Sequence, residues 1–303
     1  MTNIFKGNHY YDEAKKMTFN SHPLLTMLIF VGMFFGTAVA QLVIMIPGSI
    51  VLALIFGTEN QEAYDAWGNF VSLLSTAAPA ALVIVYCLYA EKRSAYSMGL
   101  TKKNFGKNYL IGALIGFAAF SAAMFACVLI GGVKYVGTDY QGNIPFIICM
   151  CIGWLIQGAE EEILCRGWLM TTLSTKMPMW AAVILNSVAF AALHLMNNGI
   201  NLLSIVNLTL VGIVFSLIAV RFDSLIPSCA FHSLWNLVQG NFYGLAVSGN
   251  ECGGSVFRFE ITGTNELLSG GTFGIEGGLA TTIVNVIMII LLVAIPKKNT
   301  ESK

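Results

Sequence analysis

The segment that decides the fold reads IPFIICMCIGWLIQGAEEEILCRGWLM and occupies residues 144–170. It is long and apolar enough to cross a membrane, yet it contains three consecutive glutamates, Glu160 to Glu162, followed by Arg166. An ionised side chain at bilayer depth costs at least ~2.5–3.5 kcal/mol, even on the scale measured by helix insertion. The four charged side chains therefore need polar partners inside the protein.

Two further apolar segments each contain one histidine, His194 and His232. Together with the four charged residues, these are the ionisable Asp, Glu, Lys, Arg and His side chains that we expect well inside the spans. Because lipid solvates none of them, we expect all six to face a shared polar cavity, which is where we place the function.

The composition indicates a membrane protein. Of the 303 residues 56% are hydrophobic and 11% charged, whereas a soluble domain has about 25% charged residues. A bilayer is crossed by roughly 20 apolar residues. We therefore predict an all-α, polytopic transmembrane helical bundle of about eight spans, with a membrane domain over residues 24–296 between an N-terminal segment, 1–23, and a tail, 297–303. The predicted spans are 24–46, 67–90, 109–132, 144–170, 179–197, 201–220, 225–247 and 279–295.

Lysine and arginine are distributed unevenly between the connecting segments. If the N-terminus is inside, the opposite side has only Lys134 and Arg258. The cytoplasmic side then has Lys6, Lys15, Lys16, Lys92, Arg93, Lys102, Lys103, Lys107, Lys176, Arg221, Lys297, Lys298 and Lys303. The positive-inside rule thus predicts cytoplasmic termini for this integral membrane protein. Its compact form favours a bacterial cell membrane, and no surface is basic enough to bind nucleic acid.

Two glycine pairs have the spacing that lets helices approach closely, Gly32 with Gly36 and Gly112 with Gly116. The Gly-rich stretch 248–278 is expected to be an external loop, with a short hairpin at 255–261 where apolar and polar residues alternate. No inverted repeat is evident, although paired broken helices would favour a transporter.

The fourth predicted span separates its glutamates around the helix. Glu162 and Arg166 are four residues apart on one face, so we expect a charge-assisted ion pair between them. Glu161 points about 100° away and has no obvious local partner, which suits a general base. Glu160 lies a further step around the helix. The alternative interpretation is a polar clamp between helices, without chemistry.

Each histidine has a companion four residues away on its helix, Phe190 before His194 and Asn236 after His232. With Glu161, the two imidazoles and the amide are sufficient to activate water and stabilise an oxyanion. Glu161, His194 and His232 could also ligate zinc, with the fourth position open to water. The His-Glu-x-x-His signature is absent, so zinc and a metal-free site both stay open.

Three short motifs in this order resemble a known family. Glu161-Glu162-x-x-x-Arg166, Phe190-x-x-x-His194 and His232-x-x-x-Asn236 are similar to the motifs of the CPBP family, the CAAX proteases and bacteriocin-processing enzymes also called the Abi family. This family includes CAAX prenyl protease 2 and lysostaphin resistance protein A-like proteins. The resemblance is firmest over about 144–240, the expected protease core.

The resemblance implies an intramembrane endopeptidase, a hydrolase that acts on a membrane-associated or lipidated peptide. Glu161 would activate water with the help of His194, while His232 and Asn236 would complete the water site and stabilise the oxyanion. Glu162, Arg166 and Phe190 would support these residues. The family is commonly labelled metalloprotease, although a metal-free glutamate mechanism is also argued for it. The candidate substrates are a prenylated C-terminus, a peptide pheromone or bacteriocin precursor, and the juxtamembrane segment of a membrane protein; in a bacterium, peptide processing is favoured over prenylated proteins.

Two other functions fit the same residues, a proton-coupled membrane transporter and a non-catalytic bacteriocin-immunity or scaffold protein. The depths of the predicted site residues also conflict. Glu161 is expected in the cytoplasmic half of the bilayer, whereas His194 comes late in a span that enters from the cytoplasm. It should therefore lie nearer the outer face.

Overall fold

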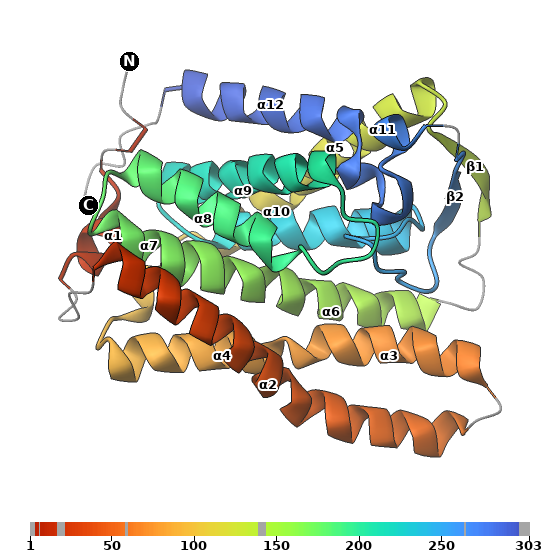
Figure 1. Cartoon of the computed structure of the whole chain (residues 1–303), viewed down its shortest axis with the longest axis horizontal. Helices are drawn as coiled ribbons and strands as arrows, with labels where there is room; N and C mark the ends of the chain where they lie inside the picture. The colour runs from red at the N-terminus through yellow and green to blue at the C-terminus, as the bar shows by residue number, and fades with distance from the viewer. Residues whose placement is uncertain are drawn as a thin grey trace.

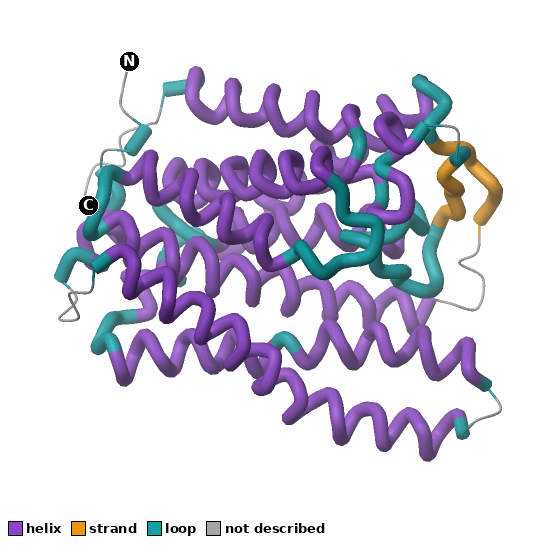
Figure 2. Tube along the Cα trace, in the orientation of Figure 1, coloured by secondary structure: helices purple, strands orange, loops and turns teal. Residues whose placement is uncertain are grey.

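The computed structural model describes residues 4–5, 7–16, 22–57, 60–138, 144–263 and 265–296. Within them the chain forms an all-α helical bundle, as predicted, with one small sheet at one end (Figures 1 and 2). The predicted tail, 297–303, and parts of the predicted N-terminal segment lie outside the described residues.

Among the described residues, five helices are long and apolar enough to cross a membrane. They are α2 (Pro23–Phe56), the continuous run of α3 (Gln61–Ser75), α4 (Ala77–Val85) and η1 (Tyr86–Ala90), α5 (Phe105–Leu129), the run of α6 (Ile144–Glu162), η3 (Ile163–Met170) and α7 (Thr171–Ser174), and α9 (Leu202–Phe222). The other three predicted spans are shorter helices: α8 (Met179–Leu193), α10 (Ile226–Leu237) with η4 (Val238–Phe242), and α12 (Leu279–Ala294). All eight predicted spans are thus helical.

The two ends of the bundle differ. At one end lie α1 (His9–Ala14) and η2 (Ala95–Met98), which we call the α1 end. At the other lie β1 (Val133–Thr138) and β2 (Phe257–Ile261), the β end, next to α11 (Glu266–Ser269) (Figure 1). Two short turns, η5 (Gly271–Phe273) and η6 (Ile275–Gly277), lead into α12.

The hairpin predicted at 255–261 is wrong in its pairing. β2 does form there, but it pairs antiparallel with β1, which follows α5. A strand needs a partner for its backbone N–H and C=O groups. Here a segment more than a hundred residues earlier in the chain supplies those hydrogen bonds.

The glycine pair of α5 has the packing role that its spacing predicts. A Cβ at Gly112 would collide with the backbone of Pro227, and one at Gly116 with that of Phe231, so α5 and α10 lie in backbone contact. The prediction is wrong for Gly32, where a Cβ would meet no atom within 4 Å. Spacing alone does not tell a helix contact from a lipid-facing surface.

The conflict over the depth of His194 disappears because α6 does not stop at Met170. The helix continues through η3 and α7 to Ser174. Glu161 therefore lies about 20 Å from that end at 1.5 Å per residue. His194 follows α8, which starts at Met179, and lies about 22 Å above its beginning. Both side chains reach the same depth, near the middle of the bundle.

Arg93, expected at the cytoplasmic surface, is buried, and so is Glu91 beside it. The Arg93 guanidinium lies 3.2 Å from the Glu91 carboxylate and donates to the hydroxyls of Thr171 and Thr172 at 2.6 and 2.9 Å. Trp168 Nε1 donates to the other Glu91 oxygen at 2.9 Å. This network attaches the segment after η1 to the last turns of the α6 run.

Candidate active site

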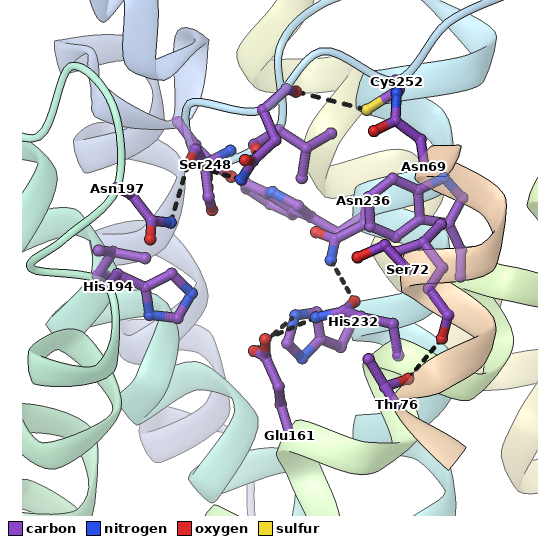
Figure 3. A pocket seen from close by; sticks show the side chains of 18 of the residues that line it. Asn69, Ser72, Thr76, Glu161, His194, Asn197, His232, Asn236, Ser248 and Cys252 are labelled. Atoms are coloured by element: carbon purple, nitrogen blue, oxygen red, sulfur yellow. Dashed lines mark hydrogen bonds and ion pairs between the residues drawn. The ribbon is translucent and has the colours of Figure 1, made fainter. Parts of the chain in front are cut away.

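A cavity of about 250 Å³ lies in the middle of the bundle, between α3, α6, α10, the end of α8 and the loop that follows η4. We call it the catalytic cavity. All four predicted catalytic residues, Glu161, His194, His232 and Asn236, line it. Figure 3 shows His194 on one wall, residues of α3 on the opposite wall, and Glu161 and His232 between them.

Of the two carboxylate oxygens of Glu161, one accepts a hydrogen bond and the other does not. Gln157, one turn earlier on α6, donates from Nε2 to Glu161 Oε1 at 2.6 Å, and Asn236 Nδ2 donates to Gln157 Oε1 at 2.9 Å. Glu161 Oε2 has no hydrogen-bond partner among the described residues and lies 3.7 Å from His232 Nε2. One carboxylate oxygen is therefore fixed, while the other can accept a proton in the cavity.

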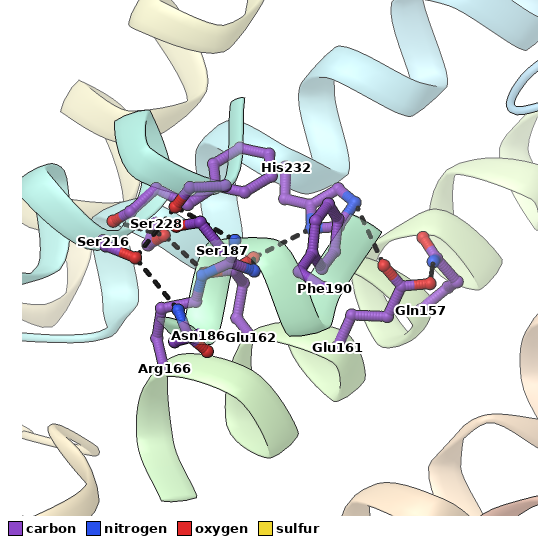
Figure 4. Close-up of polar contacts among 12 residues, drawn as sticks. Gln157, Glu161, Glu162, Arg166, Asn186, Ser187, Phe190, Ser216, Ser228 and His232 are labelled. Carbon is purple, nitrogen blue, oxygen red and sulfur yellow. Dashed lines mark hydrogen bonds and ion pairs between the residues drawn. The ribbon is translucent and has the colours of Figure 1, made fainter. Parts of the chain in front are cut away.

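His232 connects the two neighbouring glutamates (Figure 4). Its Nδ1 lies 3.1 Å from Oε1 of Glu162, and because a carboxylate paired with an arginine only accepts, the imidazole N–H is the donor. The ring stacks on Phe215 with centroids 4.6 Å apart, which fixes its plane. Nε2 is thereby directed toward Glu161.

The predicted ion pair between Glu162 and Arg166 is confirmed. Arg166 donates to Glu162 Oε1 at 2.7 Å, and both side chains are completely buried. Ser228, one turn before His232, donates to the second Glu162 oxygen at 2.7 Å. The guanidinium also donates to the carbonyl of Gly212 and lies 4.4 Å from the ring centroid of Phe190. Glu162 thus has its charge balanced and its acceptors occupied.

His194 caps the C-terminus of α8. Its Nδ1 lies 3.0 Å from the carbonyl oxygen of Phe190, which can only accept, so Nδ1 is protonated and Nε2 keeps its lone pair. The Phe190 ring lies 4.9 Å from the imidazole and also covers Arg166. Phe190 therefore contacts both the guanidinium of the ion pair and His194.

The structure adds residues to the cavity that sequence reasoning missed. Glu276, buried in the Gly-rich stretch, accepts from the backbone N–H and the hydroxyl of Ser248, and Asn197 donates to the Ser248 carbonyl at 2.9 Å. Burial raises the pKa of Glu276. No local pattern indicates this residue, whereas Gln157 and Ser228 stand four residues before Glu161 and His232 and could have been found by that spacing.

The three candidate metal ligands do not form a ready-made metal site. Carboxylate and imidazole are suitable zinc donors. In the described part of the chain, however, no three His, Cys, Asp or Glu side chains come close enough to hold a metal ion together, and His194 lies on a wall apart from Glu161 and His232 (Figure 3). We therefore derive no step through a metal.

Comparison with known proteins finds one family model that covers the segment containing this site. Residues 143–238 match the family model described as type II CAAX prenyl endopeptidase Rce1-like, a segment that includes all seven residues of the predicted site. The several apolar helices indicate a polytopic membrane protein, and the match supports a protease of the CAAX type. Over this segment the chain is similar to the CAAX proteases. No curated protein matches the chain significantly.

Proposed function

We propose that the chain is an intramembrane endopeptidase that hydrolyses a peptide bond of a membrane-associated or lipidated peptide, with Glu161 as the base that activates water. The observation that supports it best is Glu161 Oε2, which has no hydrogen-bond partner among the described residues although Glu161 lines a cavity together with two imidazoles and an amide. A polar clamp between helices would instead leave each of these groups paired.

The first step is the attack of water. Glu161 Oε2 accepts a proton from the water molecule, whose oxygen then forms a bond with the carbonyl carbon of the substrate. His194 Nε2, which has its lone pair free, accepts the second O–H of the same water and orients it. Asn236 uses one N–H to hold Gln157 and has a second for the oxyanion that forms.

The second step is the departure of the amine. The bond between the carbonyl carbon and the nitrogen breaks, and the proton on Glu161 moves to that nitrogen, so the products are a carboxylic acid and an amine. His232 Nε2, 3.7 Å from Glu161, is the nearest group with which this proton can be exchanged. The base returns to its starting state.

The buried ion pair acts through His232. Arg166 keeps Glu162 ionised, and Glu162 holds the imidazole by Nδ1, so that Nε2 stays directed at Glu161. This resembles the carboxylate that orients a catalytic histidine in other hydrolases. Neither residue needs to touch the substrate, and both are positioning residues.

The reaction takes place in a bacterial cell membrane on this proposal. The distribution of lysine and arginine supports cytoplasmic termini, and the compact chain suits a bacterial cell membrane. In such a cell, processing of bacteriocin or pheromone precursors is more plausible than removal of a prenylated C-terminal tripeptide. A metalloprotease is not required by the arrangement of the donors.

The test compares purified wild type with Glu161→Gln in detergent, on a library of lipidated and membrane-anchored peptides read by mass spectrometry. Wild type is expected to cut at defined bonds, and Glu161→Gln to lose at least roughly a hundredfold in rate. Glu160→Gln is the matched control, because Glu160 is the neighbouring buried glutamate but does not line the cavity. Equal cleavage by wild type and Glu161→Gln would remove Glu161 as the base.

A further inference from the structure

A second cavity of about 740 Å³ continues the catalytic cavity toward the β end. The two share Asn69 and Glu251 among their lining residues, and Asn69 Nδ2 donates to the Glu251 carbonyl at 3.0 Å where they meet. The second cavity, which we call the outer cavity, is also lined by Arg258 of β2. It therefore reaches from the middle of the bundle to the end at which the sheet lies.

One face of α3 is polar along this whole path. Asp65, Asn69 and Ser72 follow at intervals of four and three residues, and Thr76 comes four later, which places all of them on one side of the helix. Asp65 lines the outer cavity, Asn69 both cavities, and Ser72 and Thr76 the catalytic cavity (Figure 3). α3 is amphipathic, and its polar face lies along the two cavities.

The outer cavity has an excess of negative charge. Glu62, Asp65 and Glu251 contribute three carboxylates, all exposed. Arg258 is the one cation among its described lining residues, and its guanidinium lies 3.8 Å from Glu260. A cavity with an excess of negative charge attracts cationic groups and disfavours carboxylates.

We infer that the two cavities form one passage along α3, which admits an extended, basic peptide segment from the β end and leads it to Glu161. From Asp65 to Thr76 the helix rises about 16 Å, which an extended chain covers with about five residues. By the predicted orientation the β end faces outside. The substrate class would then be a peptide exposed on the outer face of the membrane, rather than the cytoplasmic C-terminus of a lipidated protein.

This inference rests on the proposed function for the bond that is cut, but the passage itself can be tested without proteolysis. Ser72→Cys places a thiol on the polar face of α3, and Val71→Cys is the matched control at the same depth, because Val71 packs against Gly48 of α2. Both are made in a Cys252→Ser background, since Cys252 also lines the catalytic cavity. Membrane-impermeant thiol reagents are applied from either side of oriented vesicles.

Two exposed positions identify the side of the membrane that each end of the bundle faces: Lys103→Cys at the α1 end and Arg258→Cys at the β end. We expect Ser72→Cys to react from the same side as Arg258→Cys, and Val71→Cys not to react. We further expect that this side is the outer one. Labelling of Ser72→Cys only from the Lys103→Cys side, or from neither side, would overturn the passage. A cytoplasmic β end would overturn the outer-face substrate.

Charge and peptide occupancy are tested on the same thiol. After correction for their rates with a free thiol, the cationic reagent should react with Ser72→Cys roughly tenfold faster than the anionic one. Adding Asp65→Asn and Glu251→Gln should abolish that difference. Pentalysine should slow the labelling and pentaglutamate should not; equal effects of the two peptides would contradict a basic substrate segment. If Glu161→Gln still cleaved while these results held, the proteolytic mechanism would fail and the passage would stand.

Discussion

Gln157 donates a hydrogen bond of 2.6 Å from its Nε2 to Oε1 of Glu161, one turn away on α6. The same side chain accepts from Asn236 on α10, so the amide joins the proposed base to the proposed oxyanion donor. Of the two Glu161 oxygens, this contact decides which one is left to accept a proton. The geometry of the base depends on a residue that itself does no chemistry.

Gln157→Ala should therefore lower kcat about tenfold to a hundredfold, because a hydrogen bond to a charged group is worth roughly 1.5–3 kcal/mol. KM should change little, since no contact with the substrate is removed. Steady-state kinetics on the best peptide of the library measures both values. The control is Gln41→Ala on α2, which lines neither cavity. A change in KM alone would show that Gln157 binds substrate instead.

Arg166→Ala should destabilise the protein by about 3–5 kcal/mol, because it leaves Glu162 buried without its cation. Thermal unfolding in detergent measures the loss, and Arg258→Ala serves as the exposed control. The double variant of Arg166→Met with Glu162→Gln should recover much of the stability but not the activity. If Arg166→Ala were as stable as wild type, the Glu162–Arg166 pair would have to be in contact with water.

Arg93→Ala should cost about 3 kcal/mol of stability although Arg93 lies far from the cavity, because it leaves Glu91 buried and unpaired. Lys92→Ala, next in sequence and exposed, should be neutral. Both are compared with wild type by thermal unfolding. Similar unfolding temperatures for the two variants would mean that the network does not hold the end of the α6 run.

Gly112→Ala should lower stability by roughly 1–3 kcal/mol, because its methyl group meets the backbone of Pro227 and forces α5 away from α10. Gly32→Ala is the matched control in another span, where the methyl group meets no atom, and it should be neutral or slightly stabilising. Unfolding in detergent measures the stability of both variants. If Gly32→Ala were more destabilising than Gly112→Ala, our assignment of Gly112 as the packing glycine would be wrong.

Treatment with a metal chelator should leave peptide cleavage unchanged, because Glu161, His194 and His232 do not converge as a set of metal ligands. Cleavage rates before and after dialysis against chelator measure this, with a zinc peptidase treated in parallel. Loss of activity that zinc restores would replace the glutamate mechanism with a metal-assisted one on the same residues.

Much of the local chemistry could be predicted because it is set within single helices. The pairing of Glu162 with Arg166 follows from a separation of four residues, and so does the shared face of Phe190 and His194. The depth of His194 could not be predicted in this way. This depth depends on the continuation of α6 through η3 to Ser174, whereas hydropathy predicts that the span ends at 170.

Contacts between distant segments escaped sequence reasoning for a different reason. The polar sequence neighbours of Arg93 predict a position at the surface. In the structure its guanidinium is buried and donates to the hydroxyls of Thr171 and Thr172. The strand at 257–261 shows its alternation plainly, but its partner β1 lies beyond five intervening helices. Neither contact can be predicted from the residues that surround Arg93 or β2 in the sequence.

The sequence by itself determined that this is a membrane-embedded helical protein and that Glu161, His194, His232 and Asn236 belong to its apolar segments, because hydropathy and the 3.6-residue repeat are local properties. Only the tertiary structure decided that Glu161 keeps one oxygen free, that Gln157 fixes the other, and that the polar face of α3 continues the cavity toward the β end. Those features depend on which helices become neighbours, and many arrangements of the same apolar segments satisfy the bilayer equally well.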